Sequence, residues 1–353
     1  MKNINVTAKL ILCIFCGWAY STAFATTSLW DGDPYSGSWS NTGGGSNSDG
    51  FGWVDPASPG IGDAVPNGID DIAQWNSASY YGGGGSLFLS TTVGTGNPSA
   101  GGVLNVTLGR MELNTSGDNR GFTLLSPSAG TSTLTFDVSS GNAAVHNIAQ
   151  TNKKNNGVIF DVNVHLNDSL DVYFNITDSE GPRDAITFNQ LVSGSGAINK
   201  SGIGTMKLTG TAGVNTFSGG LNITNGEVIA EKSGALGTGN LIIQQSSDTS
   251  TAQLSIMDGI SDSLSSSSTI SLFSNSGNFA TLNLGSGVNQ SISGLFFDGV
   301  AQNTGSWGAT GSGATFENDD WFVGEGVVTV IPEPSTMLLL GIGMGLMVCF
   351  RRK

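Results

Sequence analysis

A strict alternation of apolar and polar residues in the middle of the chain constrains the fold most. Between residues 158 and 176, every second side chain is apolar on both sides of a short polar turn at residues 167–169. Such alternation places one face of a strand in a core and the other in water. The apolar positions are Val158, Phe160, Val162, Val164, Leu166, Leu170, Val172, Phe174 and Ile176.

The rest of the chain favours many short strands joined by turns. Leu134, Phe136 and Val138 repeat the alternation, and further strands are expected within residues 241–284. The chain holds 53 glycines, and only 11% of its residues are charged. Glycine and asparagine tolerate the backbone conformations of tight turns. No comparable stretch between the chain ends has a helical period, so the sequence predicts an all-β fold.

Residues 194–243 contain glycine-spaced segments with alternating apolar positions. The segments read GSGAINKSGIGTMKLTG, NTFSGGLNI, NGEVIA and ALGTG, at residues 194–210, 215–223, 225–230 and 235–239. This pattern resembles the autotransporter-associated β-strand repeat, although residues 211–214 lengthen one link. The resemblance implies a right-handed parallel β-helix (solenoid), expected over residues 86–291. Stacked coils bury apolar residues that one coil leaves exposed. The alternative is an antiparallel β-sandwich of the lectin type.

Both ends of the predicted solenoid are expected to carry caps. Residues 26–85 are rich in glycine and contain four tryptophans, Trp30, Trp39, Trp53 and Trp75. Such side chains are most economically buried over an open end of the β-structure, and the alternative is that they stack on sugar rings. Residues 292–330 also concentrate aromatic side chains, and they are predicted to cap the other end.

Four aspartates of the N-terminal segment are candidate Ca²⁺ ligands, namely Asp31, Asp33, Asp70 and Asp71. The twelve-residue EF-hand spacing is absent, so solvated turn aspartates are the favoured interpretation.

The N-terminus has the pattern of a secretory signal peptide over residues 1–25. Lys2 and Lys9 precede an apolar stretch, and small residues then end in Ala23-Phe24-Ala25, the A-x-A pattern of signal-peptidase cleavage. Cleavage is expected after Ala25. Cys13 and Cys16 lie inside the removed segment, and Cys349 lies in the C-terminal apolar run. The mature extracytoplasmic part is therefore predicted to have no disulfide.

The last residues combine three features in a fixed order. Pro332, Glu333 and Pro334 form a stiff spacer, residues 337–350 form an uncharged apolar run, and Arg351, Arg352 and Lys353 end the chain. At about 1.5 Å per residue the run gives roughly 21 Å of helix, short of a bilayer core of roughly 30 Å. A transmembrane helix over residues 337–350 must therefore recruit flanking residues or thin the bilayer. The cations would remain cytoplasmic.

This tail, residues 331–353, resembles the PEP-CTERM sorting signal of bacterial exported proteins. The resemblance implies an inner-membrane-anchored intermediate, which an exosortase-type transpeptidase cleaves near Pro-Glu-Pro, and then release or re-anchoring at the cell surface. The alternative is an ordinary C-terminal anchor with a chance Pro-Glu-Pro.

The chain is strongly acidic, with a formal net charge of −14. This charge repels nucleic acid and anionic membrane surfaces, so neither is expected as a partner of the extracytoplasmic part. It is compatible with solubility outside the cell.

Catalytic signals are weak. His146 and His165 lack the H-E-x-x-H spacing, and His165 falls on the polar side of its strand. Asp161, Asp171 and Arg183 are the candidates for an acid and base set of a β-helical lyase, by proximity in sequence alone. A solvated strand face is the favoured interpretation. Thr131, Thr133 and Thr135 indicate an ice- or crystal-binding face only weakly.

The sequence therefore predicts no enzyme, no catalytic or metal-binding residue and no cofactor. The favoured function is that of an exported structural or adhesive protein of the cell surface or extracellular matrix, with exopolysaccharide as a candidate partner. The alternative is a secreted polysaccharide lyase or glycoside hydrolase on the same scaffold.

Overall fold

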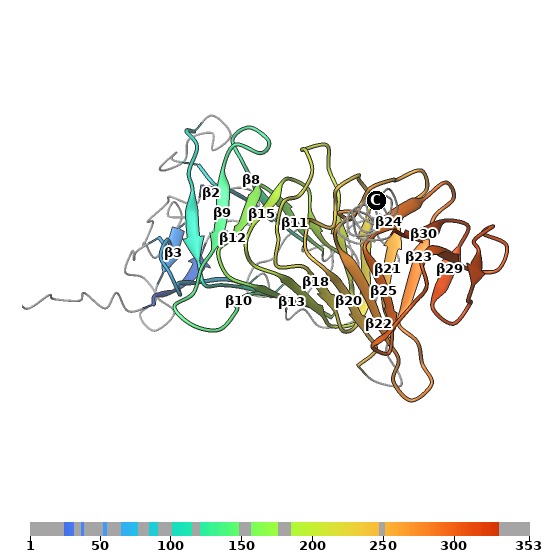
Figure 1. The fold of residues 1–353 in the computed structure, drawn as a ribbon. Coiled ribbons are helices and arrows are strands. Elements are labelled where there is room, and N and C mark those ends of the chain that lie inside the picture. The colour runs from blue at the N-terminus through green and yellow to red at the C-terminus, as the bar shows by residue number, and fades with distance from the viewer. Residues whose placement is uncertain are drawn as a thin grey trace, which may run out of the picture.

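The computed structural model describes residues 25–31, 37–38, 52–54, 65–76, 85–90, 101–114, 121–147, 157–175, 185–246 and 251–331. Every regular element in these ranges is a β-strand, and the strands form a stack that advances from the N-terminal to the C-terminal end (Figure 1). The all-β prediction is confirmed. The predicted signal helix, the cleavage residue Ala23 and the transmembrane helix 337–350 lie outside the described residues. Within the described ranges, no helix is long and apolar enough to span a bilayer.

The first sheet holds twelve strands, and its neighbours are parallel from β1 to β25. Antiparallel strands close both edges. In spatial order the strands are β26 (Val300–Ala301), β25 (Gly294–Phe297), β22 (Thr269–Phe273), β20 (Leu241–Gln244), β18 (Leu221–Ile223), β16 (Ile198–Ser201), β13 (Leu170–Phe174), β10 (Ala143–Asn147), β7 (Arg110–Asn114), β4 (Ile72–Asn76), β1 (Thr27–Asp31) and β3 (Gly52–Val54).

The second sheet holds ten strands, and all of its neighbours are parallel. In spatial order they are β2 (Gly37–Ser38), β5 (Gly85–Phe88), β8 (Phe122–Leu125), β11 (Val158–Asp161), β14 (Ala185–Phe188), β17 (Thr205–Leu208), β19 (Gly226–Ala230), β21 (Ala252–Ile256), β23 (Thr281–Leu284) and β29 (Phe322–Gly324). This parallel pairing differs from the antiparallel ladders that the alternative sandwich prediction requires.

Two smaller sheets complete the described structure. The third sheet is parallel and has the order β15 (Val192–Gly194), β12 (Asn163–Leu166), β9 (Thr133–Phe136) and β6 (Val106–Leu108). The fourth lies near the C-terminus and has the order β24 (Asn289–Ile292), β30 (Val327–Val330), β27 (Gly305–Gly308) and β28 (Phe316–Glu317).

The chain visits the first three sheets in turn. From β7 to β15 the order is first, second and third sheet, repeated three times, and from β16 to β23 the chain alternates between the first and second sheets. We call one such circuit a coil. Side chains on adjacent coils are 28 residues apart at Asp171 and Asn199, but 23 apart at Asn199 and Asn222. The coils therefore shorten where the third sheet ends.

The alternation seen in the sequence sets which side chains enter the core. The predicted apolar set from Val158 to Phe174 is buried, whereas the intervening side chains of β11, β12 and β13 are half-buried or exposed. Equivalent core residues stack from coil to coil, as Phe160 does on Phe188 with ring centroids 5.0 Å apart. Predicted strands at 241–243, 254–256, 270–273 and 280–284 are confirmed by β20, β21, β22 and β23.

Glycine is required where coils touch through their backbones. Gly196 lies between β15 and β16, and a Cβ atom there would collide with the backbone carbonyl oxygen of Asp168 on the preceding coil. Gly210, after β17, has a φ of +87° and packs equally closely on Asn189. Both glycines belong to the glycine-spaced pattern of residues 194–210, so part of that pattern reflects the close approach of adjacent coils.

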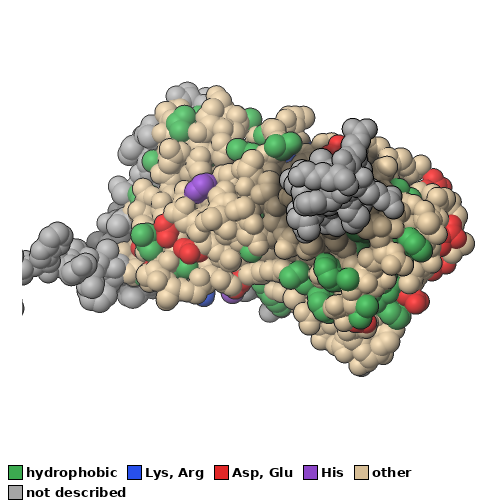
Figure 2. Space-filling view, viewed as in Figure 1, with side chains coloured by type: hydrophobic (Ala, Val, Ile, Leu, Met, Phe, Trp, Pro, Cys, Tyr) green, Lys and Arg blue, Asp and Glu red, His purple; other side chains and the backbone are tan. Residues whose placement is uncertain are grey.

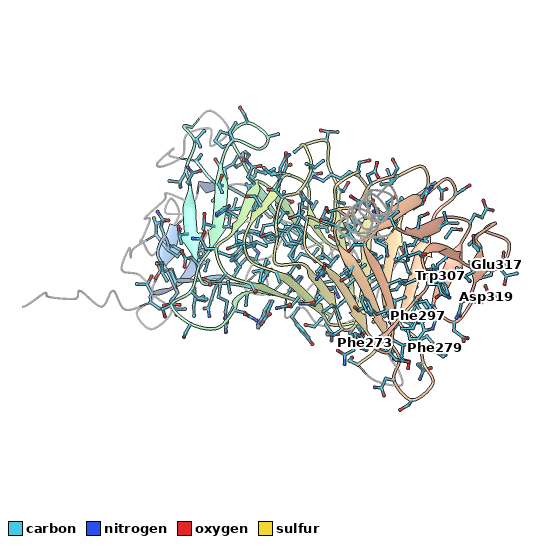
Figure 3. The ribbon with its side chains drawn as sticks, viewed as in Figure 1. Phe273, Phe279, Phe297, Trp307, Glu317 and Asp319 are labelled. Carbon is cyan, nitrogen blue, oxygen red and sulfur yellow. The ribbon has the colours of Figure 1, made fainter. Side chains whose placement is uncertain are left out.

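Tryptophans lie near both ends of the stack. Trp75 of β4 is buried and contacts Phe122 with ring centroids 4.9 Å apart. The side chains of the other three N-terminal tryptophans lie outside the described part, although β1 and β4 themselves pair within the first sheet. At the C-terminal end of the stack, six residues form what we call the aromatic cluster, in which Phe297 and Trp307 lie close together (Figure 3), with ring centroids 5.5 Å apart. Its members are Phe279, Phe297, Trp307, Phe316, Trp321 and Phe322.

Apolar and charged side chains cover only a small part of the face shown in Figure 2. On this face, acidic side chains gather at the C-terminal end. Glu317 and Asp319 lie at that end (Figure 3). A backbone hydrogen bond from Thr310 lowers the pKa of the exposed Asp319 carboxyl below its usual value.

Candidate functional site

The outer surface of the first sheet carries two hydrogen-bonded groups of polar side chains and, beside them, a pair of rings. These side chains lie on strands β4 to β18 and beside them, at positions where the period-two pattern turns side chains toward solvent. We call this surface the ladder face, and it comprises Gln74, Arg110, Glu112, Asn142, His146, Asp171, Tyr173, Asn199 and Asn222.

One row of the ladder face is a chain of amide and carboxylate groups. Asp171 Oδ1 accepts hydrogen bonds from Asn142 Nδ2 at 2.9 Å and from Asn199 Nδ2 at 2.8 Å. Asn222 Nδ2 then donates to Asn199 Oδ1 at 2.7 Å. Asp171, Asn199 and Asn222 are direct partners in the strand register, so parallel pairing brings them together although they are far apart in sequence.

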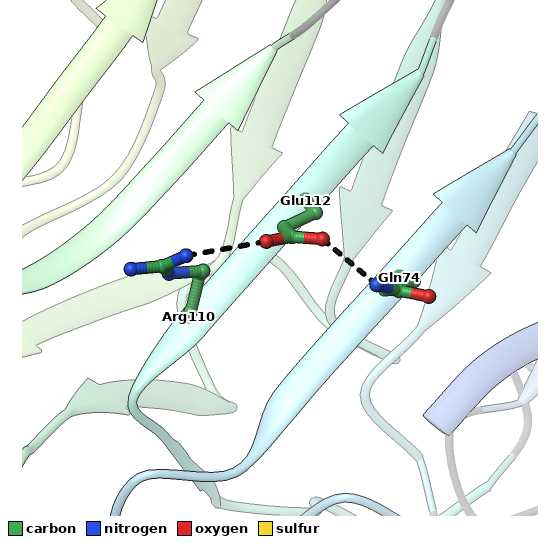
Figure 4. Close-up of polar contacts among 3 residues, drawn as sticks. All are labelled: Gln74, Arg110 and Glu112. Carbon is green, nitrogen blue, oxygen red and sulfur yellow. Dashed lines mark hydrogen bonds and ion pairs between the residues drawn. The ribbon is translucent and has the colours of Figure 1, made fainter. Parts of the chain in front are cut away.

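The neighbouring row begins with a carboxylate held by two donors. Gln74 Nε2 donates to Glu112 Oε2 at 2.8 Å, and Arg110 Nη1 donates to Glu112 Oε1 at 3.3 Å (Figure 4). The Arg110 and Glu112 side chains are 43% and 29% exposed, so solvent screens this ion pair. The pairing balances the positive charge of Arg110 within the ladder face.

His146 and Tyr173 continue this row. They are register partners on β10 and β13, and their rings meet edge to face with centroids 6.1 Å apart. Burial and, to a lesser extent, the charge of Arg110 lower the pKa of His146 below its usual value, while Glu112 and Asp171 oppose the shift. Burial thus favours the neutral form of the imidazole. Tyr173 remains 37% exposed and presents its ring to solvent.

The ladder face offers carboxylate acceptors, amide donors and an exposed aromatic ring. Glu112 and Asp171 each accept two side-chain hydrogen bonds, which fixes their oxygens as acceptors. Asparagine amides supply donors beyond those used in the row, because each amide nitrogen carries two N–H groups. An exposed aromatic ring beside such groups can contact the apolar face of a ligand ring.

The acid and base set predicted from sequence is not brought together. Asp161 lies on β11 in the second sheet, where it accepts hydrogen bonds from Asn189 at 2.8 Å and Gln190 at 2.6 Å. Asp171 lies on β13 in the first sheet, and Arg183 lies outside the described residues. The two candidate aspartates are close in sequence but lie on different sheets, because the chain turns between β11 and β13.

The third sheet carries the other predicted polar positions. His165 lies on the polar side of β12, as predicted, and its Nδ1 is 3.0 Å from Ser193 Oγ on the next coil. Thr133 and Thr135 lie on β9, and Thr107 is the register partner of Thr135. Thr131 lies in the preceding turn, where its hydroxyl donates to the Ser128 carbonyl at 2.6 Å.

Two of the candidate Ca²⁺ ligands bond to backbone N–H groups. Asp71 Oδ1 accepts from Thr26 N at 2.7 Å, and Asp70 Oδ1 accepts from Ser139 N at 2.8 Å. The side chain of Asp31 and all of Asp33 lie outside the described part. In the described part of the chain, no group of three or more His, Cys, Asp or Glu residues is placed to hold a metal ion.

The ladder face cannot be recognised from the sequence directly, because its members come from separate coils. The ladder face could be found by aligning the outward-facing residues of each strand with the outward-facing residues of the next strand in the same sheet. His146 and Tyr173 occupy such equivalent positions. Coil lengths must be known to apply this rule, and these vary along the chain.

The predicted sorting residues Pro332, Glu333, Pro334, Arg351, Arg352 and Lys353 lie outside the described residues. Of the predicted signal-cleavage residues, Ala25 is the first described residue and is exposed.

No curated protein and no solved structure matches the chain. Residues 330–353 match a family model described as the PEP-CTERM protein-sorting motif, and the match does not extend to residues 194–243. This motif implies export and processing by an exosortase-type enzyme. The chain therefore carries a signal that supports its sorting to the cell surface.

Proposed function

We propose that this chain is an exported structural or adhesive protein of the cell surface or extracellular matrix. The PEP-CTERM motif at residues 330–353 is the observation that carries the proposal. Signal peptidase removes residues 1–25, and the apolar run at 337–350 holds an intermediate in the inner membrane. An exosortase-type transpeptidase then cuts near Pro332, Glu333 and Pro334. The N-terminal bulk is thereby delivered outside the cell.

The delivered part is a right-handed β-solenoid with an autotransporter-type repeat at residues 194–243. The coil-by-coil path of the chain through three and then two sheets supports this fold. The glycines of the repeat segment occupy close contacts between coils, as a solenoid requires. Such a scaffold presents outward-facing positions at a regular spacing from coil to coil. This regularity suits an extended adhesive or structural surface.

The protein acts without catalysis in this proposal. The titratable groups of the ladder face lie on strand surfaces, and both of its carboxylates are already engaged by neighbouring side chains. The predicted acids Asp161 and Asp171 lie on different sheets.

Mass spectrometry of both termini tests the processing route. The form recovered from the culture medium or cell surface is expected to begin at Thr26 and to end near Pro332. Exosortase-deficient cells should retain a longer form in the membrane fraction. Recovery of the intact C-terminus as the sole form in wild-type membranes would contradict the proposal.

One observation favours a second candidate function, a polysaccharide lyase or glycoside hydrolase. A neutral His146 beside Tyr173 could serve as a base next to an acid, with Arg110 nearby. Incubation of the full-length protein with neutral and uronate polysaccharides, followed by chromatography of reducing ends and absorbance of unsaturated products, tests this function. If the wild-type protein forms product and His146→Ala does not, the enzymatic function is favoured over the adhesive one.

A further inference from the structure

We propose that the ladder face is a binding site for a neutral, hydroxyl-rich polysaccharide, which lies across strands β7 to β18. This inference rests on the proposed adhesive function and names its ligand class. The site is defined by Tyr173 and by the row of Asn142, Asp171, Asn199 and Asn222. No other part of the described surface combines an exposed tyrosine with such a row.

Tyr173 supplies the apolar contact. It is the tyrosine among the exposed large hydrophobic residues of the described part, Asp171 precedes it on the outward face of β13, and its register partners are His146 and Ser201. The edge-to-face contact with His146 restricts the tilt of its ring. Sugar rings present C–H groups on one face, and an aromatic ring held in a fixed orientation can pack against that face with a small loss of side-chain entropy.

The amide row supplies the hydrogen bonds. Its donors and acceptors repeat from coil to coil at the strand spacing of about 4.8 Å. This repeat is similar to the length of one sugar unit in an extended chain, so successive sugars can meet successive coils. Within the described residues, Asn142 and Asn222 are each shown donating one side-chain hydrogen bond, which leaves a second N–H for sugar hydroxyls.

Charge favours a neutral polymer over a polyanion. The Arg110 cation is paired with Glu112, and Asp171 adds an anion to the same face. The whole chain has a net charge of −14. A polyuronate would therefore meet repulsion both at the site and from the rest of the molecule.

Affinity gel electrophoresis of the full-length chain tests the inference. The probes are hydroxyethylcellulose, mixed-linkage β-glucan, dextran and alginate, each cast separately into a non-denaturing gel. At least one of the three neutral glucans is expected to retard the protein, and alginate is not. Tyr173→Ala should weaken binding roughly tenfold, which corresponds to about 1.4 kcal/mol, and Tyr173→Phe should bind within about threefold of wild type.

Asn283→Ala is the matched control, because Asn283 belongs to a similar polar row on β23 of the second sheet. It should bind as wild type does, and circular dichroism should show that all variants are folded. Absence of binding to every neutral glucan, preferential binding of alginate, or equal binding by Tyr173→Ala would each overturn the proposal. These outcomes leave the mass-spectrometric test of export unaffected, so failure of the two proposals can be told apart.

Discussion

At the residue scale, Lys200 is the most unusual side chain of the core. It lies on β16 at an inward position and is 0% exposed. In its protonated form, its Nζ donates to the backbone carbonyls of Ser201 at 3.0 Å, Gly202 at 2.7 Å and Asn225 at 3.2 Å. These bonds join two successive coils at the corner after the strand. Burial lowers the pKa of Lys200 from 10.5 to about 7, because desolvation disfavours the charged amine.

The lowered pKa of Lys200 predicts that stability rises with pH. Between about pH 7 and 10.5 the unfolded chain binds a proton that the folded chain has released, so the free energy of unfolding increases through this window. A single such group contributes at most about 1.4 kcal/mol per pH unit. Urea unfolding of the full-length chain at pH 7, 8 and 9 measures the slope. Lys200→Met should be flatter across this range.

Lys207→Met is the control for this experiment. Lys207 lies on the outer side of β17, where its Nζ is 3.5 Å from Glu231 Oε1 and both side chains are 30% exposed. This variant should keep the wild-type slope. If Lys200→Met and wild type showed the same dependence on pH, the neutral buried amine would be ruled out.

At the element scale, buried amides replace strand pairing where the third sheet stops. β15 is the last strand of that sheet, and Thr216 N next donates to the Val192 carbonyl at 2.8 Å without forming a strand. Asn215 is 2% exposed and accepts from Val192 N at 3.0 Å while donating to the Ala235 carbonyl at 2.7 Å. It thus bonds to the coils on both sides. Gln290 bonds in a related way to both backbone groups of Leu264.

Asn215→Ala is expected to destabilise the protein by about 2 kcal/mol, because it leaves a buried N–H and a buried carbonyl without their side-chain partner. Chemical denaturation followed by circular dichroism measures the change. Asn222→Ala removes an amide of the ladder face instead, and as a surface change it should cost about 0.5 kcal/mol or less. Equal effects of the two substitutions would show that Asn215 does not connect the coils.

The elements themselves could largely be predicted from sequence, whereas their alignment could not. Alternation alone identified the inward side chains of β11, β12 and β13, because burial and strand period are local properties. The partnership of Asp171 with Asn199 depends on a separation of 28 residues, and that of Asn199 with Asn222 on 23. No single period relates these residues. The entry of β1 and β4 into the first sheet was not predicted, because the tryptophans and glycines of residues 26–85 indicated a cap instead.

At the scale of the whole molecule, the two ends of the stack differ in how their sheet edges are covered. The first sheet ends in short antiparallel strands, β3 and β26. The C-terminal edge of the second sheet is β29, and the aromatic cluster packs beside it. Trp321, immediately before β29, is 5% exposed and stacks on Phe297 with centroids 5.0 Å apart. Unpaired strand edges favour association between molecules, so covering an edge disfavours pairing with another chain there.

Trp321→Ala tests whether the aromatic cluster secures this end. Removing a buried tryptophan should lower the free energy of unfolding by about 3–5 kcal/mol, because the contacts with Phe279 and Phe297 are lost. The loosened β29 edge should also increase self-association, which light scattering detects. Val323→Ala, two residues on and 47% exposed, should change stability by about 0.5 kcal/mol or less and leave self-association at the wild-type level. If Trp321→Ala matched Val323→Ala in both stability and self-association, the cluster would not be what holds the C-terminal end of the stack closed.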